Sequence, residues 1–139
     1  MGRILALDYG KKRTGIAVTD PLKIIATGLT TVDSQTLFDF LKTYVSKESV
    51  EKILIGEPFN LDGSVTDATA AVQHCIRRLK NSFPNIPIET IDERYTSKMA
   101  SRAMVEMGMK KKDRQKKGMI DEVAATMMLQ EFLANNEFR

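Results

Sequence analysis

Short apolar runs and segments with helical spacing alternate along this chain. Residues 4–7 form an unbroken apolar run that suits a strand buried on both faces, and the run ends at Asp8. A turn containing glycines and cations follows, and residues 16–18 form a second apolar strand. Residues 24–32 are a third strand candidate after the turn at Asp20-Pro21. The short connections predict that these three strands are antiparallel neighbours.

The next segments change to helical spacing and back. Residues 35–48 carry apolar side chains at the spacing of one helix face, and residues 52–56 then form a fourth strand, parallel to the first because a helix precedes it. Ser64 and Asp67 form a capping pattern that predicts the start of a helix of about 18 residues. Its expected buried stripe consists of Val65, Ala68, Val72, Cys75, Ile76, Leu79 and Phe83.

The last third of the chain predicts one more strand and two helices. The strand covers residues 86–91, and Thr96 caps a helix that stops at Gly108. A final helix spans about residues 119–133. Three antiparallel strands followed by alternating helices and strands predict an α/β fold with a mixed five-stranded sheet flanked by helices. No boundary or repeat divides residues 1–139, so we expect a single domain.

Composition excludes several classes of protein. A single cysteine, Cys75, cannot form an internal disulfide and is typical of a reducing cytoplasm. The N-terminal apolar run is too short for a signal peptide, and no run approaches the ~20 residues that span a bilayer. His74 lies off the stripe that holds Cys75, which disfavours a His–Cys metal or nucleophile pair. We expect a cytoplasmic protein with no membrane contact.

The net charge of +3 is unevenly distributed. Without residues 110–117 the chain would have a net charge of −2, so one short segment holds the whole basic excess. Such a segment is typical of a surface that binds a polyanion, and the alternative is a solvated loop. Its cations are Lys110, Lys111, Lys112, Arg114, Lys116 and Lys117.

Acidic residues end several of the predicted elements. Asp8 ends the first strand, Asp92 and Glu93 end the fifth, and Glu57 follows the fourth. The ends of parallel strands meet at one edge of a sheet, where open α/β folds generally build their sites. A plain structural alternative for Asp8 is a strand-ending residue that accepts hydrogen bonds from the turn.

The final helix adds a further candidate. Asp121 shares a face with Ala124, Ala125 and Met128, whereas the spacing places Glu122 on a solvated face. A carboxylate on an apolar stripe needs compensation. A metal ion could provide it, or the helix dipole could, since Asp121 lies in the first turn.

Carboxylates without a cluster of histidine or cysteine are ligands for hard ions, which favours Mg²⁺ or Mn²⁺ over zinc. Two such ions about 4 Å apart can activate a water molecule and stabilise the leaving oxygen in phosphodiester cleavage. With a basic segment just before the helix of Asp121, the residues point to a nuclease.

Four motifs in order resemble the YqgF (RuvX) family of RNase H-like proteins, which are relatives of the RuvC Holliday junction resolvases. They lie at residues 7–18, 55–64, 92–96 and 120–125, so the resemblance covers nearly the whole chain. It implies an RNase H-like fold and a bacterial nuclease that matures the 5′ end of 16S rRNA. Members of this family were earlier described as Holliday junction resolvases.

The resemblance also implies roles for residues. Its motifs place the metal-binding acids at Asp8, Glu93 and Asp121, with Lys12 and Arg94 as phosphate contacts. Glu57 departs from the family pattern, which more often has an apolar residue before the proline. Since RuvC-type enzymes carry a catalytic glutamate at the end of the fourth strand, Glu57 is a further candidate metal ligand.

Three functions remain open from the sequence. The favoured one is a Mg²⁺-dependent endonuclease that acts on structured RNA rather than on DNA junctions. A nuclease of the same kind that cleaves DNA junctions, as RuvC does, is the alternative within this class. The second is a non-catalytic nucleic-acid-binding module with the same fold. The third, a sugar kinase or actin-like ATPase, needs two such domains around a nucleotide, and 139 residues supply one.

Overall fold

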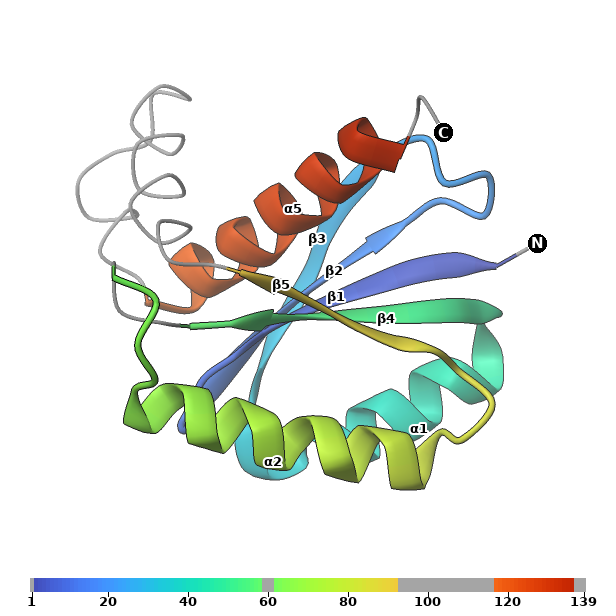
Figure 1. Ribbon diagram of the computed structural model, residues 1–139. Helices are drawn as coiled ribbons and strands as arrows, with labels where there is room; N and C mark the ends of the chain where they lie inside the picture. Colours follow the sequence, from blue (N-terminus) through green and yellow to red (C-terminus); the bar gives the residue numbers. More distant parts are fainter. Residues whose placement is uncertain (1, 59–61, 93–116, 137–139) are drawn as a thin grey trace.

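The computed structural model describes residues 2–58, 62–92 and 117–136, and it contains the predicted mixed sheet. The strands lie in the order β3-β2-β1-β4-β5, with helices α1 and α2 on one face and α5 on the other (Figure 1). The strand that ends near Asp8 is therefore the central one. Within the described residues, no helix has the length and apolar character needed to span a membrane.

The first three strands form the expected antiparallel meander. Strand β1 spans Arg3–Tyr9, β2 spans Arg13–Thr19 and β3 spans Ala26–Asp33. Strand β3 begins two residues later than the pattern predicts. Ile24 and Ile25 belong to the preceding loop because the side chain of Asp20 binds their backbone N–H groups there.

The two parallel strands also follow the prediction. A short 3₁₀ turn, Ser34–Thr36, leads into α1, Leu37–Lys47, and the chain returns as β4, Val50–Glu57, beside β1. Strand β5, Ile88–Asp92, pairs in parallel with β4 at the edge of the sheet. Both β4 and β5 therefore point their carboxyl ends in the same direction as β1.

Helix α2, Asp67–Ser82, starts with a different cap from the one expected. Thr66 is the N-cap, and it forms the reciprocal capping box with Thr69. Ser64 instead donates its backbone N–H to the carboxylate of Asp62 in the preceding turn. Val65 consequently lies outside the helix and is 64% exposed, contrary to the predicted stripe.

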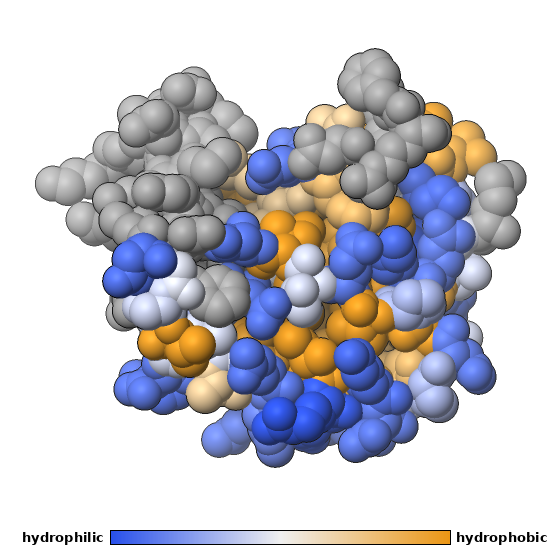
Figure 2. Space-filling model, in the orientation of Figure 1, coloured by the Kyte–Doolittle hydropathy of each residue, from blue (hydrophilic) through white to orange (hydrophobic). Residues whose placement is uncertain are grey.

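The remainder of the α2 stripe is largely as predicted. Val72, Cys75, Leu79 and Phe83 are buried and Ile76 is half-buried, whereas Ala68 is exposed. The additional buried residue is Thr69, which is drawn inward because its hydroxyl also donates to the carbonyl of Pro58. Figure 2 shows the polar outer side of the molecule along α2, with hydrophobic residues gathered between α2 and α5.

Helix α5, Lys117–Asn136, is longer than predicted and covers the second face of the sheet. Small residues meet there: Ala6 and Ala17 of the sheet pack in one buried cluster with Ala125 of the helix. The rest of this cluster consists of Ile4, Leu54, Met128 and Leu129. The predicted helix over residues 96–108 and the basic segment up to residue 116 lie outside the described residues.

Candidate active site at the carboxyl edge of the sheet

Asp8 lies at the carboxyl end of the central strand, on the face that α5 covers. It pairs with Gly15 of the neighbouring strand β2. Along β1, the side chain of Asp8 is on the same face of the sheet as those of Ile4 and Ala6, which pack against α5. Its side chain is half-buried, as expected for a strand end that opens toward solvent. Asp8 also takes part in an interaction within the structure.

Glu57 lies at the same edge but follows the opposite alternation. It pairs with Asp92 of β5. Along β4, its side chain is on the same face of the sheet as those of Ile53 and Ile55, which pack against α1 and α2. Strand geometry therefore directs Asp8 and Glu57 to different faces of the sheet. Glu57 as a ligand beside Asp8 is the one sequence candidate that the strand register disfavours.

The other two predicted ligands are only partly placed. Glu93 follows Asp92, the last residue of β5, and lies outside the described residues. The backbone of Asp121 is in the first turns of α5, which begins at the edge where β4 and β5 end (Figure 1). The side chain of Asp121 lies outside the described part. Within residues 2–58, 62–92 and 117–136, no three carboxylate, histidine or cysteine side chains gather as a metal site.

A cationic turn follows Asp8 at the same edge of the sheet. Gly10 donates its N–H to the carbonyl of Arg13 at 2.9 Å, which closes the turn and leaves Lys11 and Lys12 exposed at its tip. The sequence identified Lys12 alone, although Lys11 occupies an equivalent exposed position. Arg94 and residues 110–116 lie outside the described residues, and so does the side chain of Lys117.

Hydroxyl groups behind the turn fix its position. Ser34 donates its backbone N–H to the carbonyl of Lys12 at 2.9 Å and its side-chain hydroxyl to the carbonyl of Gly10. The buried hydroxyl of Thr14 lies 2.9 Å from that of Ser34. The contact of Ser34 with the turn depends on the pairing of β2 with β3, which local sequence does not reveal.

The opposite face holds buried groups without the character of a reaction centre. Burial raises the pKa of the Cys75 thiol to about 11, so this thiol remains protonated and belongs to the core, as predicted. Burial also raises the pKa of Tyr9, with a smaller contribution from Cys75, while nearby Arg78 opposes the shift. The guanidinium of Arg78 lies 4.0 Å from the ring centre of Phe38.

Glu122 does not follow the prediction of a solvated position. Its side chain is half-buried against β3, where a Cβ atom built on Gly28 would come within 2.7 Å of its Oε1. Ala124, Ala125 and Met128, which were predicted to share a face with Asp121, are buried, whereas the side chain of Asp121 lies outside the described part. Helix α5 therefore rests on β3 through Glu122 and on the central strands through its alanines.

Comparison with known proteins identifies the family. The family model described as "RuvX: Holliday junction resolvase" matches residues 2–135. The chain belongs to the RuvX family. This membership confirms the resemblance drawn from the four motifs, and it makes the chain a nuclease, an enzyme that hydrolyses phosphodiester bonds and binds nucleic acid.

Similar sequences match over nearly their whole length. A protein of Flavobacterium psychrophilum is 53% identical over 133 residues, covering 96% of this chain and 97% of its own. Proteins of Bacteroides fragilis and Porphyromonas gingivalis are each 50% identical, covering 96% and 97% of this chain and 96% and 98% of their own. All three are named "Putative pre-16S rRNA nuclease".

A solved structure supports the fold. RuvC of T. thermophilus, in complex with a Holliday junction substrate, superposes with a TM-score of 0.55 at 13% identity. The match covers 97% of this chain and 96% of that protein. The mixed sheet and this likeness confirm the RNase H-like fold that the family resemblance implied.

Proposed function

We propose that this RuvX-family chain is a metal-dependent endonuclease that processes the 5′ end of the 16S rRNA precursor in the cytoplasm. The observation that carries the proposal is the carboxyl edge of the sheet. There, Asp8 ends the central strand on the face of α5, and the exposed cations of the following turn lie beside it. The names of the relatives favour precursor rRNA as the substrate.

The donor set at this edge fits a hard divalent ion. Asp8 is a half-buried carboxylate that faces α5, and the two partners proposed for it, Glu93 and Asp121, also offer oxygen atoms alone. Mg²⁺ or Mn²⁺, when bound, would polarise the attacking water and neutralise charge on the leaving 3′ oxygen. Glu57 is left out of this set because its strand alternation directs it under α2.

The chain's own residues have two further tasks in this proposal. Lys11 and Lys12 hold the phosphate backbone at the edge of the site, since their turn follows the strand of Asp8 directly. Ser34 and Thr14 keep that turn in place through the hydroxyl bonds described above. We also assign phosphate contacts to Arg94 and to the cations of residues 110–117, whose side chains lie outside the described part.

A cleavage assay on two substrates tests the proposal. Purified protein is incubated with end-labelled precursor rRNA and with a four-way DNA junction, each with Mg²⁺ and with EDTA. We expect Mg²⁺-dependent cleavage of the RNA, its loss in Asp8→Asn, and its retention in Asp39→Asn, which changes an exposed carboxylate on α1. Cleavage of the junction alone would assign the chain to the resolvase activity in its family description. No cleavage of either substrate would leave a nucleic-acid-binding module.

A further inference from the structure

The two helices on one face of the sheet, α1 and α2, carry an excess of positive charge. Together they contain five cations and two carboxylates, so their solvent side is positive. Figure 2 shows hydrophilic residues gathered along α2 at the lower edge of the molecule. All five cations are exposed: Lys42 and Lys47 on α1, and Arg77, Arg78 and Lys80 on α2.

Two of these cations lie on the sides of the helices that meet. The guanidinium of Arg78 lies 4.0 Å from the ring centre of Phe38, in the first turn of α1, and Lys42 follows Phe38 by one helical turn. Lys80 comes two residues after Arg78, and Lys47 comes nine residues after Phe38. Both separations place a side chain on about the opposite side of an α-helix. Lys42 and Arg78 therefore flank one seam between α1 and α2, and Lys47 and Lys80 lie away from it.

Arg78 is held in a form that suits a phosphate. Its stack on Phe38 fixes the guanidinium, whose planar fork of N–H donors matches phosphate oxygens. Within the described residues, neither Arg78 nor Lys42 forms an ion pair with a carboxylate. The helix dipole accounts for Lys80, which lies in the last turn of α2, but its effect is confined to that turn, and Arg78 precedes it.

The seam continues from the cationic turn at the carboxyl edge of the sheet. Ser34 donates its N–H to the carbonyl of Lys12 at 2.9 Å, and α1 begins three residues later. Burial raises the pKa of Tyr9 and the charge of Arg78 opposes this shift, so the field of Arg78 reaches the residue that follows Asp8. A phosphate chain that leaves the turn along the start of α1 therefore next meets Arg78.

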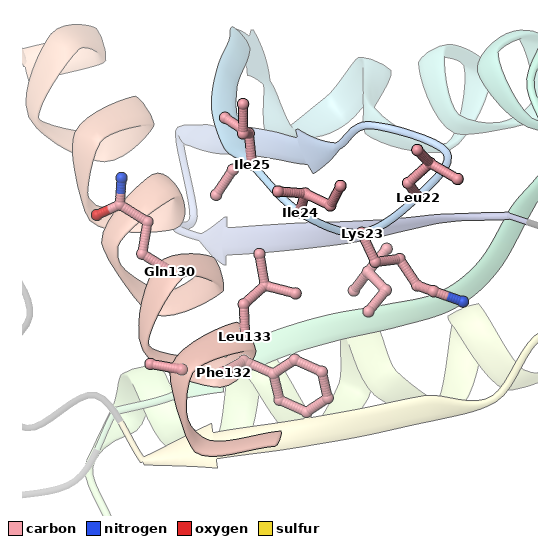
Figure 3. A pocket seen from close by; sticks show the side chains of 10 residues that line it. Leu22, Lys23, Ile24, Ile25, Gln130, Phe132 and Leu133 are labelled. Atoms are coloured by element: carbon pink, nitrogen blue, oxygen red, sulfur yellow. The ribbon is translucent and has the colours of Figure 1, made fainter. Parts of the chain in front are cut away.

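The opposite side of the sheet offers a polyanion no such cations within the described part. An apolar groove of about 680 Å³ lies there, between the loop before β3 and the last turns of α5 (Figure 3). Lys23 lines this groove and pairs with Glu51 at 2.6 Å. Lys52 lies over the ring of Phe132 and pairs with Glu89 at 3.7 Å. The charges beside the groove are neutralised, and those at the seam are not.

We propose that the seam of Lys42, His74 and Arg78 binds the phosphate backbone of a nucleic-acid strand that flanks the part held at the carboxyl edge. The fork of Arg78 binds phosphate oxygens, Lys42 adds a second charge, and His74, exposed one turn before Arg78, offers a ring N–H. These contacts give affinity and orientation without reading bases. The path from the carboxyl edge rests on the function proposed above, whereas phosphate binding at the seam does not.

RNA binding in EDTA tests the seam with the full chain. A fluorescein-labelled RNA hairpin with a single-stranded flank of about ten nucleotides is titrated by anisotropy at several salt concentrations. Lys42→Gln/Arg78→Gln should weaken binding roughly ten-fold and flatten the log–log salt slope by about 1.4–1.8, at ~0.7–0.9 per phosphate contact. Lys47→Gln/Lys80→Gln removes two charges from the same two helices and should change binding by less than about two-fold.

Folding is checked separately, because Arg78→Gln also removes the stack on Phe38. Urea melts monitored by circular dichroism measure the stability of each variant. If Lys42→Gln/Arg78→Gln does not fold, Lys42→Gln takes its place with Lys47→Gln as its control. The single substitution should weaken binding about three-fold and flatten the slope by about 0.7–0.9.

Three results would overturn the proposal. Equal losses in the seam and control variants would show that RNA senses net charge alone. Unchanged RNA binding in a less stable seam variant would make the stack of Arg78 on Phe38 a structural contact only. Seam-dependent binding of polyglutamate, with RNA binding independent of the seam, would assign this surface to an acidic protein. Seam-dependent RNA binding without any cleavage would support the seam and refute the proposed endonuclease.

Discussion

Replacing Gly10 with alanine should destabilise the protein clearly, while the same replacement of Gly28 should be nearly neutral. A Cβ atom on Gly10 would lie 2.7 Å from the carbonyl oxygen of Arg13. That oxygen accepts the N–H of Gly10 and closes the turn, so it cannot retreat without opening the turn. A Cβ atom on Gly28 would lie 2.7 Å from Oε1 and 2.9 Å from Cγ of Glu122, but these atoms belong to a flexible side chain that can change rotamer as a whole, whereas a backbone carbonyl cannot.

The magnitudes follow from these contacts. Forcing a methyl group against fixed atoms costs about 1–3 kcal/mol. Both substitutions recover about 0.4–1 kcal/mol by restricting the unfolded chain, because neither glycine has a positive φ. Gly10→Ala should therefore lose about 1–2 kcal/mol of unfolding free energy, and Gly28→Ala should stay within about 0.5 kcal/mol of the parent.

Urea melts of the two variants and the parent, monitored by far-ultraviolet circular dichroism, measure this difference. The double variant Gly28→Ala/Glu122→Ala is the control, because removal of the Glu122 side chain also removes the contact. Coupling between these two substitutions should stay below about 0.5 kcal/mol if the carboxylate moves freely. Equal losses in Gly10→Ala and Gly28→Ala would refute the distinction between a fixed backbone atom and a mobile side chain.

Three further predictions concern metal and nucleic-acid binding. Without metal, Asp8→Asn should be as stable as the parent or about 1 kcal/mol more stable, because crowded carboxylates repel, and Mg²⁺ should raise the urea midpoint of the parent more than that of the variant. A destabilised variant beside a Mg²⁺-indifferent parent would contradict the metal site. Neutralising the six cations of residues 110–117 should flatten the log–log salt dependence of nucleic-acid binding by roughly 2–4 if three or four of them contact phosphate, and an unchanged slope would make the segment a solvated loop. Asp121→Asn should abolish cleavage while Glu122→Gln leaves the rate within a few-fold; similar losses would show that the two helix positions are not distinct.

The strands and the directions of the first four could be predicted because each strand carries its own local signal. The apolar runs before Asp8 and Glu57 are continuous, as expected for central strands with both faces covered, and the helix between them requires a parallel crossover. Asp8 could be identified as a candidate for the same reason, since a carboxylate directly after a buried run is visible in the sequence.

The wrong predictions share a different cause, which is competition among polar groups for the backbone. Ile24 and Ile25 have strong strand propensity, but the carboxylate of Asp20 binds their N–H groups and bends the chain. Thr66 displaces Ser64 as the cap of α2 because the hydroxyl of its partner Thr69 also reaches the carbonyl of Pro58, a contact that sequence spacing does not encode.

The position of Glu122 depended on tertiary structure in another way. Helical periodicity grouped it with polar residues, but α5 lies across β3 as well as β2, and the absence of a side chain at Gly28 leaves space for the carboxylate. The alternation that separates Asp8 from Glu57 is likewise a property of strand register. Which face each carboxylate occupies can be deduced only when the pairing of β1 with β4 is known residue by residue.

The packing of α5 against the first strands also determines when the molecule can become complete during synthesis. The face made by Ile4, Ala6, Ala17 and Leu54 is translated early, yet the helix that covers it comes last in the chain. A ribosome adding about 5–20 residues per second leaves this apolar face uncovered for several seconds. A chain that stalls before residue 117 therefore exposes an apolar face of its sheet to chaperones and proteases. It also lacks the helix that carries Asp121. Quality control can recognise an unfinished copy before it could act on any nucleic acid.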